Sequence, residues 1–537
     1  MTLKITTDNT VYNAGIIGFL DVLEECNISY IIHGPVLSIE SDDLIKADLG
    51  QAFIDLCIKK FYKSTGIFNA INQAQKLLDS KSYDEKEFIK SVKEIAKRFL
   101  QASIKTGIET LLKSGFETDI LEIAEQLNKE EQAESAQALL RRLLAEFEKN
   151  EVKKMIYIKS IIYTKVRQIW DGISFLNKNE AKVHPKESFD RVFVQPLKKM
   201  MDNLDKKAKK SCAICGIEYN DLTSFSYLND IGIDVNRKKS AFWNFKHDLS
   251  ICPLCNFIYA CTVLGFNQIG QDMVFINSGT DIKQLQEVNI KNRDNEREGN
   301  YRYKIISQLI LEESEQKAQE FGQYHSLEVL VRHSLNSDKS IYLIDIIDRN
   351  TLDTIIKCRN EINLLTKSYA RYFGEPLQYA VLGKLLDRQD LYEIINYLLK
   401  ESNGDYSYVF EANVVLNIQI NTEVEQKMKQ LRFLSNAALE EGAELRRYFY
   451  DGKNNENKLN ANCIKLQNAL RNEDTELFFD ILFKLYSGTK VTPSSIFLEA
   501  LTDNFNPIAT GFILGLMGAK DKNSNKKENE LKDVREE

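Results

Sequence analysis

Hydrophobic and polar residues follow a helical period over most of this chain. Residues 13–26, NAGIIGFLDVLEEC, place isoleucines and leucines on one stripe and acidic residues on the other side. Residues 130–149 repeat the pattern, with an apolar face of Ala133, Ala136, Leu140, Leu143, Leu144 and Phe147. Residues 70–210 and 421–519 are helical in pattern almost throughout. Helix is therefore the predominant element that the sequence predicts.

Strand patterns are short and scattered between the helical stretches. Residues 30–40, YIIHGPVLSIE, predict two strands joined by a Gly-Pro turn, and MVFIN at 273–277 predicts another. IYLIDIID at 341–348 fits a buried strand or a helix, because periodicity does not separate the two. Residues 405–420 carry strand propensity in their second half. The polar stretch 287–301 is expected to be an exposed loop.

These elements define an α+β fold class that is predominantly helical. A length of 537 residues exceeds one hydrophobic core, so about two to four domains are expected. We predict a mixed N-terminal domain at residues 1–205 and an embedded zinc-ribbon-like module at 206–265. A mixed α/β domain at 266–420, a C-terminal helical bundle at 421–520 and a disordered charged tail at 521–537 are expected to follow.

Composition is that of a globular protein, with 43% hydrophobic and 28% charged residues. The net charge of −7 neither predicts nor excludes nucleic-acid binding, which depends on local patches. The first residues lack the pattern of a signal peptide. The most apolar stretch, residues 508–519, has twelve residues where about twenty are needed to span a membrane, which favours a buried helix. A cytoplasmic location without a membrane partner is expected.

Four of the nine cysteines form two C-x-x-C pairs, Cys212 with Cys215 and Cys252 with Cys255. Two-residue spacing lets both sulfurs of a pair reach one ion, and four thiolates complete a tetrahedral zinc site with no open position for water. We therefore predict structural Zn²⁺ as the cofactor. An iron–sulfur cluster and disulfides are the alternatives. Cys26, Cys57, Cys261, Cys358 and Cys463 are expected to be buried thiols.

The segment between the cysteine pairs is rich in cations and aromatic residues. Residues 236–248, NRKKSAFWNFKHD, interleave both types, and residues 198–246 hold ten Lys/Arg against six Asp/Glu. Cations suit phosphates and aromatic faces suit bases, so nucleic-acid contact is one interpretation. The other is that the aromatic rings close a small ribbon core surrounded by solvated lysines.

Catalytic signatures are lacking in the sequence. No phosphate-binding G-x-x-x-x-G-K-[ST] motif, G-x-G-x-x-G motif or H-E-x-x-H motif occurs. His247-Asp248 forms an HD dipeptide, but the further ligands of a metal phosphohydrolase cannot be assembled. His325 and His333 lie eight residues apart on an expected helix and are treated as ordinary core or surface residues. We expect that the protein is not an enzyme.

Three stretches carry a resemblance to a known family. They are DNTVYNAGIIGFLDVLEE at 8–25, CAIC followed by FWNFKHDLSICPLC at 212–255, and GAELRRYFYDGKNNENKLN at 442–460. Together they resemble the large subunit of type I-B CRISPR surveillance complexes (Cascade) of the Thermotoga–Neap (Cst) subtype. The resemblance implies a non-catalytic ribonucleoprotein subunit for antiviral defence. Its implied partners are CRISPR guide RNA, target DNA, other Cascade subunits and a helicase–nuclease.

The large subunit of such a complex would bind the 5′ end of the guide, recognise the motif beside the target and support duplex opening. Base pairing with the guide reads the remaining sequence. From the residues we predict a DNA-contacting surface formed by Lys238, Lys239, Asn244 and Lys246. Weaker phosphate contacts are expected from the lysine-rich lead-in before the first cysteine pair, at Lys206, Lys207, Lys209 and Lys210. The rival class is a stand-alone zinc-ribbon nucleic-acid-binding accessory factor.

The resemblance also implies an internally translated small subunit. Met428 lies near the start of the C-terminal helical unit, in EQKMKQLRFLSN. Translation from Met428 would yield the last 110 residues (537 − 428 + 1). The alternative is an ordinary core methionine.

Overall fold

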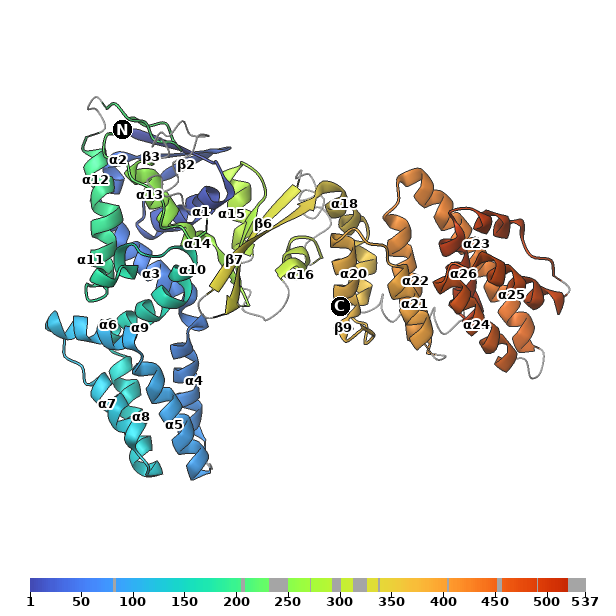
Figure 1. Cartoon of the computed structure of the whole chain (residues 1–537), viewed down its shortest axis with the longest axis horizontal. Coiled ribbons are helices and arrows are strands. Elements are labelled where there is room, and N and C mark those ends of the chain that lie inside the picture. Colours follow the sequence, from blue (N-terminus) through green and yellow to red (C-terminus); the bar gives the residue numbers. More distant parts are fainter. Residues whose placement is uncertain are drawn as a thin grey trace. The chain divides into compact units, whose positions relative to one another are not determined.

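The computed structural model consists of two compact units, Met1–Glu298 with Leu327–Ile346, and Gly299–Ser326 with Ile347–Glu537 (Figure 1). The structure describes residues 1–80, 84–203, 208–230, 250–270, 272–291, 301–311, 326–336, 339–402, 405–451, 456–489 and 491–519. The fold class is α+β and mostly helical, with small sheets and a four-cysteine cluster in the middle of the chain. The predicted tail 521–537 lies outside the described residues.

The first unit begins with a three-stranded antiparallel sheet of order β1-β3-β2. Its strands are β1 (Thr2–Thr6), β2 (Tyr30–His33) and β3 (Val36–Glu40), with Ile5 opposite Leu37. Alternation along β1 buries Leu3 and Ile5, as expected of a sheet with one covered face. The two strands predicted over residues 30–40 are confirmed.

Helix α1 (Thr10–Glu25) follows β1 and is almost entirely buried. The Asn9 side chain caps it by accepting a hydrogen bond from the amide of Tyr12 at 3.0 Å. The helix predicted at residues 13–26 is confirmed. It lies beside helices α13 (Pro253–Ala260) and α14 (Thr262–Gly265), so the first and last parts of this unit share one core.

The other helices of the unit surround this core and extend from it (Figure 1). The predicted apolar face of residues 130–149 is confirmed except at Leu144, which is only partly buried. The α-helices are α2 (Ser41–Lys46), α3 (Leu49–Phe61), α4 (Gly66–Asp79), α5 (Glu85–Phe99), α6 (Ala102–Lys113), α7 (Ile120–Lys129), α8 (Ala133–Phe147), α9 (Asn150–Ile161), α10 (Arg167–Ile169), α11 (Pro185–Phe189), α12 (Gln195–Met201) and α15 (Ile282–Lys291). Short 3-10 or π turns are η1 (Tyr62–Ser64), η2 (Ile162–Val166), η3 (Ser174–Leu176), η4 (Lys178–Glu180) and η5 (Asp190–Val194).

A second sheet has the order β4-β5-β6-β7. Its strands are β4 (Asn267–Ile269), β5 (Asp272–Asn277), β6 (Ser326–Asn336) and β7 (Lys339–Asp348). The strand predicted at 273–277 is confirmed, and the ambiguous stretch 341–348 is a strand. The helix expected around His333 is wrong, because β6 pairs with β5 in a register that sets Met273 opposite Arg332. His325 lies outside the described residues.

The second unit is built mainly of helices. They are α16 (Tyr301–Ile306), α18 (Arg349–Lys357), α19 (Arg359–Leu365), α20 (Leu377–Leu386), α21 (Tyr392–Glu401), α22 (Tyr406–Asn421), α23 (Glu425–Asp451), α24 (Glu456–Arg471), α25 (Thr475–Ser487) and α26 (Phe505–Leu516), with η7 (Ser307–Leu311) and η8 (Ser495–Leu501). A two-stranded hairpin joins β8 (Arg371–Tyr372) to β9 (Glu375–Pro376).

Two expectations about irregular and extended structure are wrong. Residues 405–420 form the helix α22, which begins at the Asp405 cap and buries Val409, Ala412 and Val415 against its neighbours. Burial on several sides outweighs the strand propensity of its Val and Ile residues. The loop expected over residues 287–301 is wrong at both ends, because α15 continues to Lys291 and α16 begins at Tyr301; residues 292–300 lie outside the described residues.

In the C-terminal part, α23 and α26 pack in close backbone contact. A Cβ atom built on Gly511 would lie 3.1 Å from the carbonyl carbon of Ser435, so only glycine permits this approach. Residues 508–516 are fully buried, which confirms the predicted buried helix. Within the described residues, no helix is long and apolar enough to cross a bilayer.

Candidate metal centre

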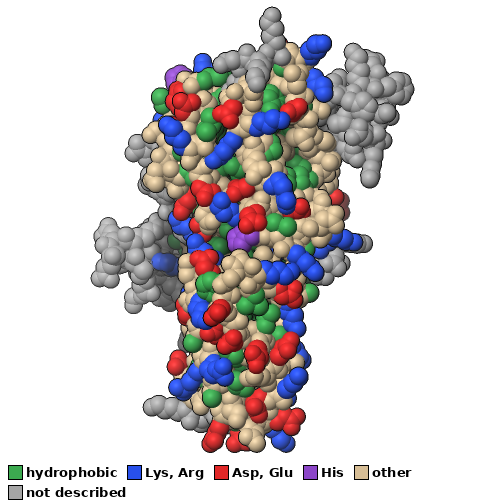
Figure 2. All heavy atoms as spheres, turned by 90° about the vertical axis from the view of Figure 1, so that its left-hand side faces the viewer, with side chains coloured by type: hydrophobic (Ala, Val, Ile, Leu, Met, Phe, Trp, Pro, Cys, Tyr) green, Lys and Arg blue, Asp and Glu red, His purple; other side chains and the backbone are tan. Residues whose placement is uncertain are grey.

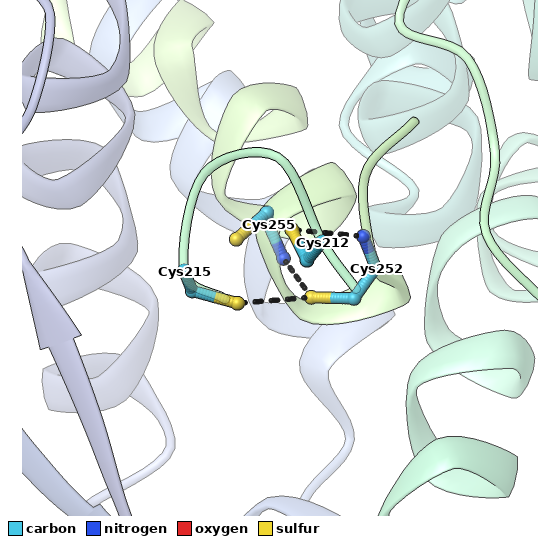
Figure 3. Close-up of side chains that lie close together, drawn as sticks. All are labelled: Cys212, Cys215, Cys252 and Cys255. Carbon is cyan, nitrogen blue, oxygen red and sulfur yellow. Dashed lines mark hydrogen bonds between the residues drawn. The ribbon is translucent and has the colours of Figure 1, made fainter. Parts of the chain in front are cut away.

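The first cysteine pair lies in a tight turn. The Cys212 amide donates to the Ile217 carbonyl at 2.9 Å, and the Gly216 amide donates to the Cys212 carbonyl at 3.0 Å. Gly216 has φ +72°, a left-handed conformation that glycine adopts without steric cost. This turn directs the side chains of Cys212 and Cys215 toward the second pair (Figure 3).

The second pair lies at the start of α13. Cys252 is the N-cap residue, and its Sγ accepts a hydrogen bond from the Cys255 amide at 3.5 Å. Pro253 occupies the first turn, where its missing N–H costs nothing. Every residue of α13 is buried, so the helix that carries Cys255 belongs to the core of the unit. The second pair is thus held by the core.

Backbone pairing joins the two halves of the cluster. The Ala213 amide donates to the Ser250 carbonyl at 3.0 Å, and Thr223 and Ile251 exchange hydrogen bonds of 2.9 and 2.8 Å. The Cys252 amide also donates to the Cys212 Sγ at 3.3 Å. These hydrogen bonds therefore bring together two cysteine pairs that lie far apart in the sequence.

The four sulfur atoms lie within 4.8 Å of one another, and the Sγ atoms of Cys215 and Cys252 are 3.6 Å apart (Figure 3). Zinc–sulfur bonds of about 2.3 Å in a tetrahedron place the sulfurs about 3.8 Å apart, whereas a disulfide needs about 2.05 Å. All nine cysteines are free thiols. The donor set and spacing therefore fit a metal ion such as zinc.

The electrostatics of the cluster also favour a cation. Hydrogen bonding from Cys215 lowers the pKa of Cys212, while the hydrogen bond with Cys212 and burial raise the pKa of Cys252. Four adjacent thiolates would repel one another in this buried setting. A bound divalent ion would supply the compensating charge and hold all four sulfurs deprotonated.

Helix α1 contributes a contact that the sequence did not reveal. The Tyr12 hydroxyl lies 3.3 Å from the Cys255 Sγ, and burial followed by the nearby Cys255 raises the Tyr12 pKa well above its ordinary value. The Tyr12 and Tyr259 rings meet edge to face at 5.1 Å. The Asn9 side-chain amide donates to the Tyr259 hydroxyl at 3.0 Å. A tyrosine among the buried residues of α1 was the available signal in the sequence.

Glycines allow α1 to approach helix α13, which carries Cys255, and the segment that follows it. A Cβ atom built on Gly15 would lie 3.0 Å from the carbonyl carbon of Ile258. One on Gly18 would lie 2.8 Å from the Gly265 amide nitrogen and 3.0 Å from the carbonyl carbon of Cys261. Because these neighbours are backbone atoms, no side-chain rotation can relieve the clash.

The predicted nucleic-acid residues are only partly described. Lys209 and Lys210 are exposed beside the first cysteine pair, and the Lys209 amide donates to the Asn220 side chain at 3.0 Å. On the face of the first unit in Figure 2, basic and acidic side chains are interspersed. The remaining predicted residues lie outside the described residues: Lys206, Lys207, Lys238, Lys239, Asn244 and Lys246.

The other predicted cysteines do not join the cluster. Cys57, Cys261, Cys358 and Cys463 are buried, as expected, whereas Cys26 is half-buried. His333 pairs with Asp272 through its Nδ1 at 2.8 Å. Among the described residues, the four clustered cysteines are the group placed to hold a metal.

Comparison with known proteins gives one result. Residues 205–267 match the family model described as CRISPR-associated protein (Cas_CXXC_CXXC), and this range contains both cysteine pairs. No curated protein and no solved structure matches the chain. It is thus a CRISPR-associated protein that carries a CXXC–CXXC domain, and the domain coincides with the cluster that the fold assembles.

Proposed function

We propose that this chain is the non-catalytic large subunit of a type I-B CRISPR RNA-guided surveillance complex that acts in antiviral defence in the cytoplasm. The observation that carries the proposal is the match of residues 205–267 to a CRISPR-associated family over a closed four-cysteine cluster. The quoted similarities at residues 8–25 and 442–460 extend the same resemblance to both ends of the chain.

A structural rather than catalytic role is favoured by the donor set. Four thiolates saturate a tetrahedral zinc ion, so no coordination position is left for water or substrate. The cysteines Cys212, Cys252 and Cys255 are also buried, which separates such an ion from a substrate in solution. The chain's part in the complex is then to bind, and cleavage is assigned to the recruited helicase–nuclease.

Recognition of nucleic acid is assigned to the segment between the cysteine pairs and to its lysine-rich lead-in. Both ends of that segment are anchored: the Asp230 carboxylate accepts from buried Arg332 at 2.5 Å, and Ser250 pairs with Ala213. In the proposed function this segment contacts the target-adjacent motif. Phosphate contacts fix the register, and the guide reads the rest of the target by base pairing.

Co-purification tests the proposed function. The tagged chain, expressed with its neighbouring genes, is expected to retain guide RNA and the other Cascade subunits. The double variant Lys238→Glu with Lys239→Glu should weaken binding of the assembled complex to target duplex and flatten its salt dependence. Lys86→Glu with Lys90→Glu, on α5, is the charge-matched control. A chain that carries no guide RNA yet binds DNA alone would support the stand-alone accessory factor instead.

An internally translated small subunit is a separable part of the proposal. Met428 is half-buried in the first turn of α23, and a product starting there retains α23 to α26. That product would lose α22, including the Tyr406 hydroxyl that accepts from Arg446 at 3.0 Å. Mass spectrometry of material from the intact gene should detect a product of 110 residues beginning at Met428. Met428→Leu should abolish it while leaving the full chain intact. Absence of the product in the wild type would refute this part alone.

A further inference from the structure

The β8–β9 hairpin of the second unit carries an unusual residue at its turn. Phe373 and Gly374 are the two central residues, with φ +47° and +89°. Two-residue turns with both φ angles positive strongly favour Asn-Gly, because a bulky side chain in the left-handed region is strained. Nevertheless the Phe373 side chain is 76% exposed, so burial does not explain its presence. A strained and exposed aromatic residue at a hairpin tip is a reason to look for a ligand.

Phe373 belongs to a cluster of three rings at the surface. Its centroid lies 4.7 Å from that of Tyr372 and 5.1 Å from that of Tyr397, and the two tyrosines are 5.2 Å apart. The cluster borders a pocket of about 370 Å³. Asn396 and Asn506 line the same pocket, so hydrogen-bonding groups lie beside the apolar faces. This combination suits a flat, polar-edged aromatic group such as a nucleobase.

The charges around the pocket are arranged for an anion. Lys400 and Arg471 line it, are exposed, and form no ion pair among the described residues. Of the two acidic residues of the same pocket, Glu393 pairs with Lys384 at 2.8 Å, whereas Glu473 accepts a hydrogen bond from the neutral side chain of Asn506 at 3.0 Å and keeps its charge. Because Lys400 and Arg471 outweigh the carboxylate of Glu473, the net charge beside the rings is positive.

We propose that this surface, defined by Tyr372, Phe373, Tyr397, Lys400 and Arg471, binds an unpaired base of single-stranded nucleic acid. The base stacks on the exposed Phe373 ring, and the flanking phosphates pair with Lys400 and Arg471. The inference rests on the proposed nucleic-acid function and gives it a second contact surface, in a part of the chain distinct from the cysteine domain. In that function the bound strand is one that is left unpaired when the duplex opens.

The variant Phe373→Asn separates a binding role from a structural one. Asparagine adopts left-handed φ angles readily and is favoured in this turn, so the variant should melt at the same temperature as the wild type or higher. The substitution replaces the ring with a small polar side chain that has no aromatic face for stacking. With the full-length chain and a fluorescent oligothymidylate of about twelve nucleotides, binding should weaken about tenfold, the expected loss of one stacked base. Oligouridylate of equal length shows whether the surface prefers DNA or RNA.

Two controls make the result decisive. An abasic oligodeoxynucleotide of the same length should bind wild type and Phe373→Asn equally, because it has no base to stack. Phe433→Ala removes an aromatic ring of similar exposure, 68%, on α23, and should leave oligothymidylate binding unchanged. Lys400→Gln with Arg471→Gln should lower the slope of binding against salt.

The inference is overturned if Phe373→Asn binds both oligonucleotides as the wild type does. It is also overturned if the wild type binds abasic and base-bearing strands equally, or if Phe433→Ala weakens binding as strongly. Failure of the proposed function appears differently, as a chain that does not co-purify with guide RNA. The two failures are therefore distinguishable.

Discussion

Substitution of Gly18 by alanine should weaken both the first unit and its metal site. The added methyl group would lie 2.8 Å from the Gly265 amide nitrogen, some 0.6 Å inside the 3.4 Å at which ordinary contacts begin, and closer still to the Cys261 carbonyl oxygen. Both neighbours are backbone, so α1 and the α13–α14 segment must move apart. Overpacking of this kind costs about 1–3 kcal/mol.

The same displacement reaches the cysteine cluster. Helix α1 carries Tyr12, whose hydroxyl contacts the Cys255 sulfur, and metal sites tolerate errors of only about 0.2 Å in ligand distances. Loss of a contact to a ligand atom typically costs about 10–100-fold in metal affinity. We therefore expect Gly18→Ala to release zinc to a chelator at correspondingly lower concentrations.

The assay combines calorimetry with chelator competition on the full chain. The melting temperature of the first unit should fall by about 2–4 °C for each kcal/mol lost. Gly66→Ala is the matched control. Gly66 is the first residue of α4, and a Cβ atom built on it would meet no atom nearer than 3.7 Å. It should be neutral or slightly stabilising. If Gly18→Ala melts and holds zinc as the wild type does, the proposed coupling between the packing of α1 on the α13–α14 segment and the cysteine cluster is refuted.

Further outcomes follow from individual buried groups. Cys252→Ala should reduce bound zinc from one ion per chain to none, whereas Cys261→Ala, a buried thiol outside the cluster, should retain it; elemental analysis decides. Burial lowers the pKa of Lys159 from 10.5 to about 8, so the folded state binds fewer protons than the unfolded chain between these values. The contribution of Lys159 to stability should therefore rise as pH increases from 8 to 10.5; buried Lys165 acts in the same direction, and buried thiols such as Cys57, whose pKa burial raises, act in the opposite one. Lys159→Met should be more stable than the wild type by up to about 3 kcal/mol at pH 7, and this difference should shrink by pH 10.5, as measured by denaturant titration at both pH values. Arg332→Leu should lower the melting temperature, because it removes the hydrogen bond of 2.8 Å to the Gln168 carbonyl and leaves the Asp230 carboxylate without its cation.

Elements with a single amphipathic face were predictable from sequence. Residues 133–147 show the stripe that one-sided burial imposes, and the strands at 30–40 are joined by a Gly-Pro turn. Helix α22 could not be predicted in this way because it is buried on several sides and Glu411, Gln419 and Asn421 are among its buried residues, so its polar positions do not mark one exposed face. Propensity alone then favours the strand, and tertiary packing decides otherwise.

The candidate metal site was predictable as a set of ligands but not as a place in the fold. Two C-x-x-C pairs predict ligation because their spacing is local, whereas the contact of Tyr12 with Cys255 joins residues 243 positions apart. No local pattern encodes such a contact. The hairpin at Phe373 was missed for a related reason, since its turn lacks the Asn-Gly signal that identifies such hairpins in a sequence.

The cysteine domain depends on the remainder of its unit for its structure. Cys252 of the second cysteine pair caps α13, a helix with no exposed face. Helix α1, near the start of the unit, packs against that helix. A metal ion at the four sulfurs would join the start of α13 to the turn at Cys212, and because it binds the folded chain its binding free energy would add to the stability of the unit. Under the proposed function, this arrangement holds both ends of the nucleic-acid-binding segment on a rigid base. The ion would then act on recognition indirectly, by fixing where that segment leaves the core and where it returns.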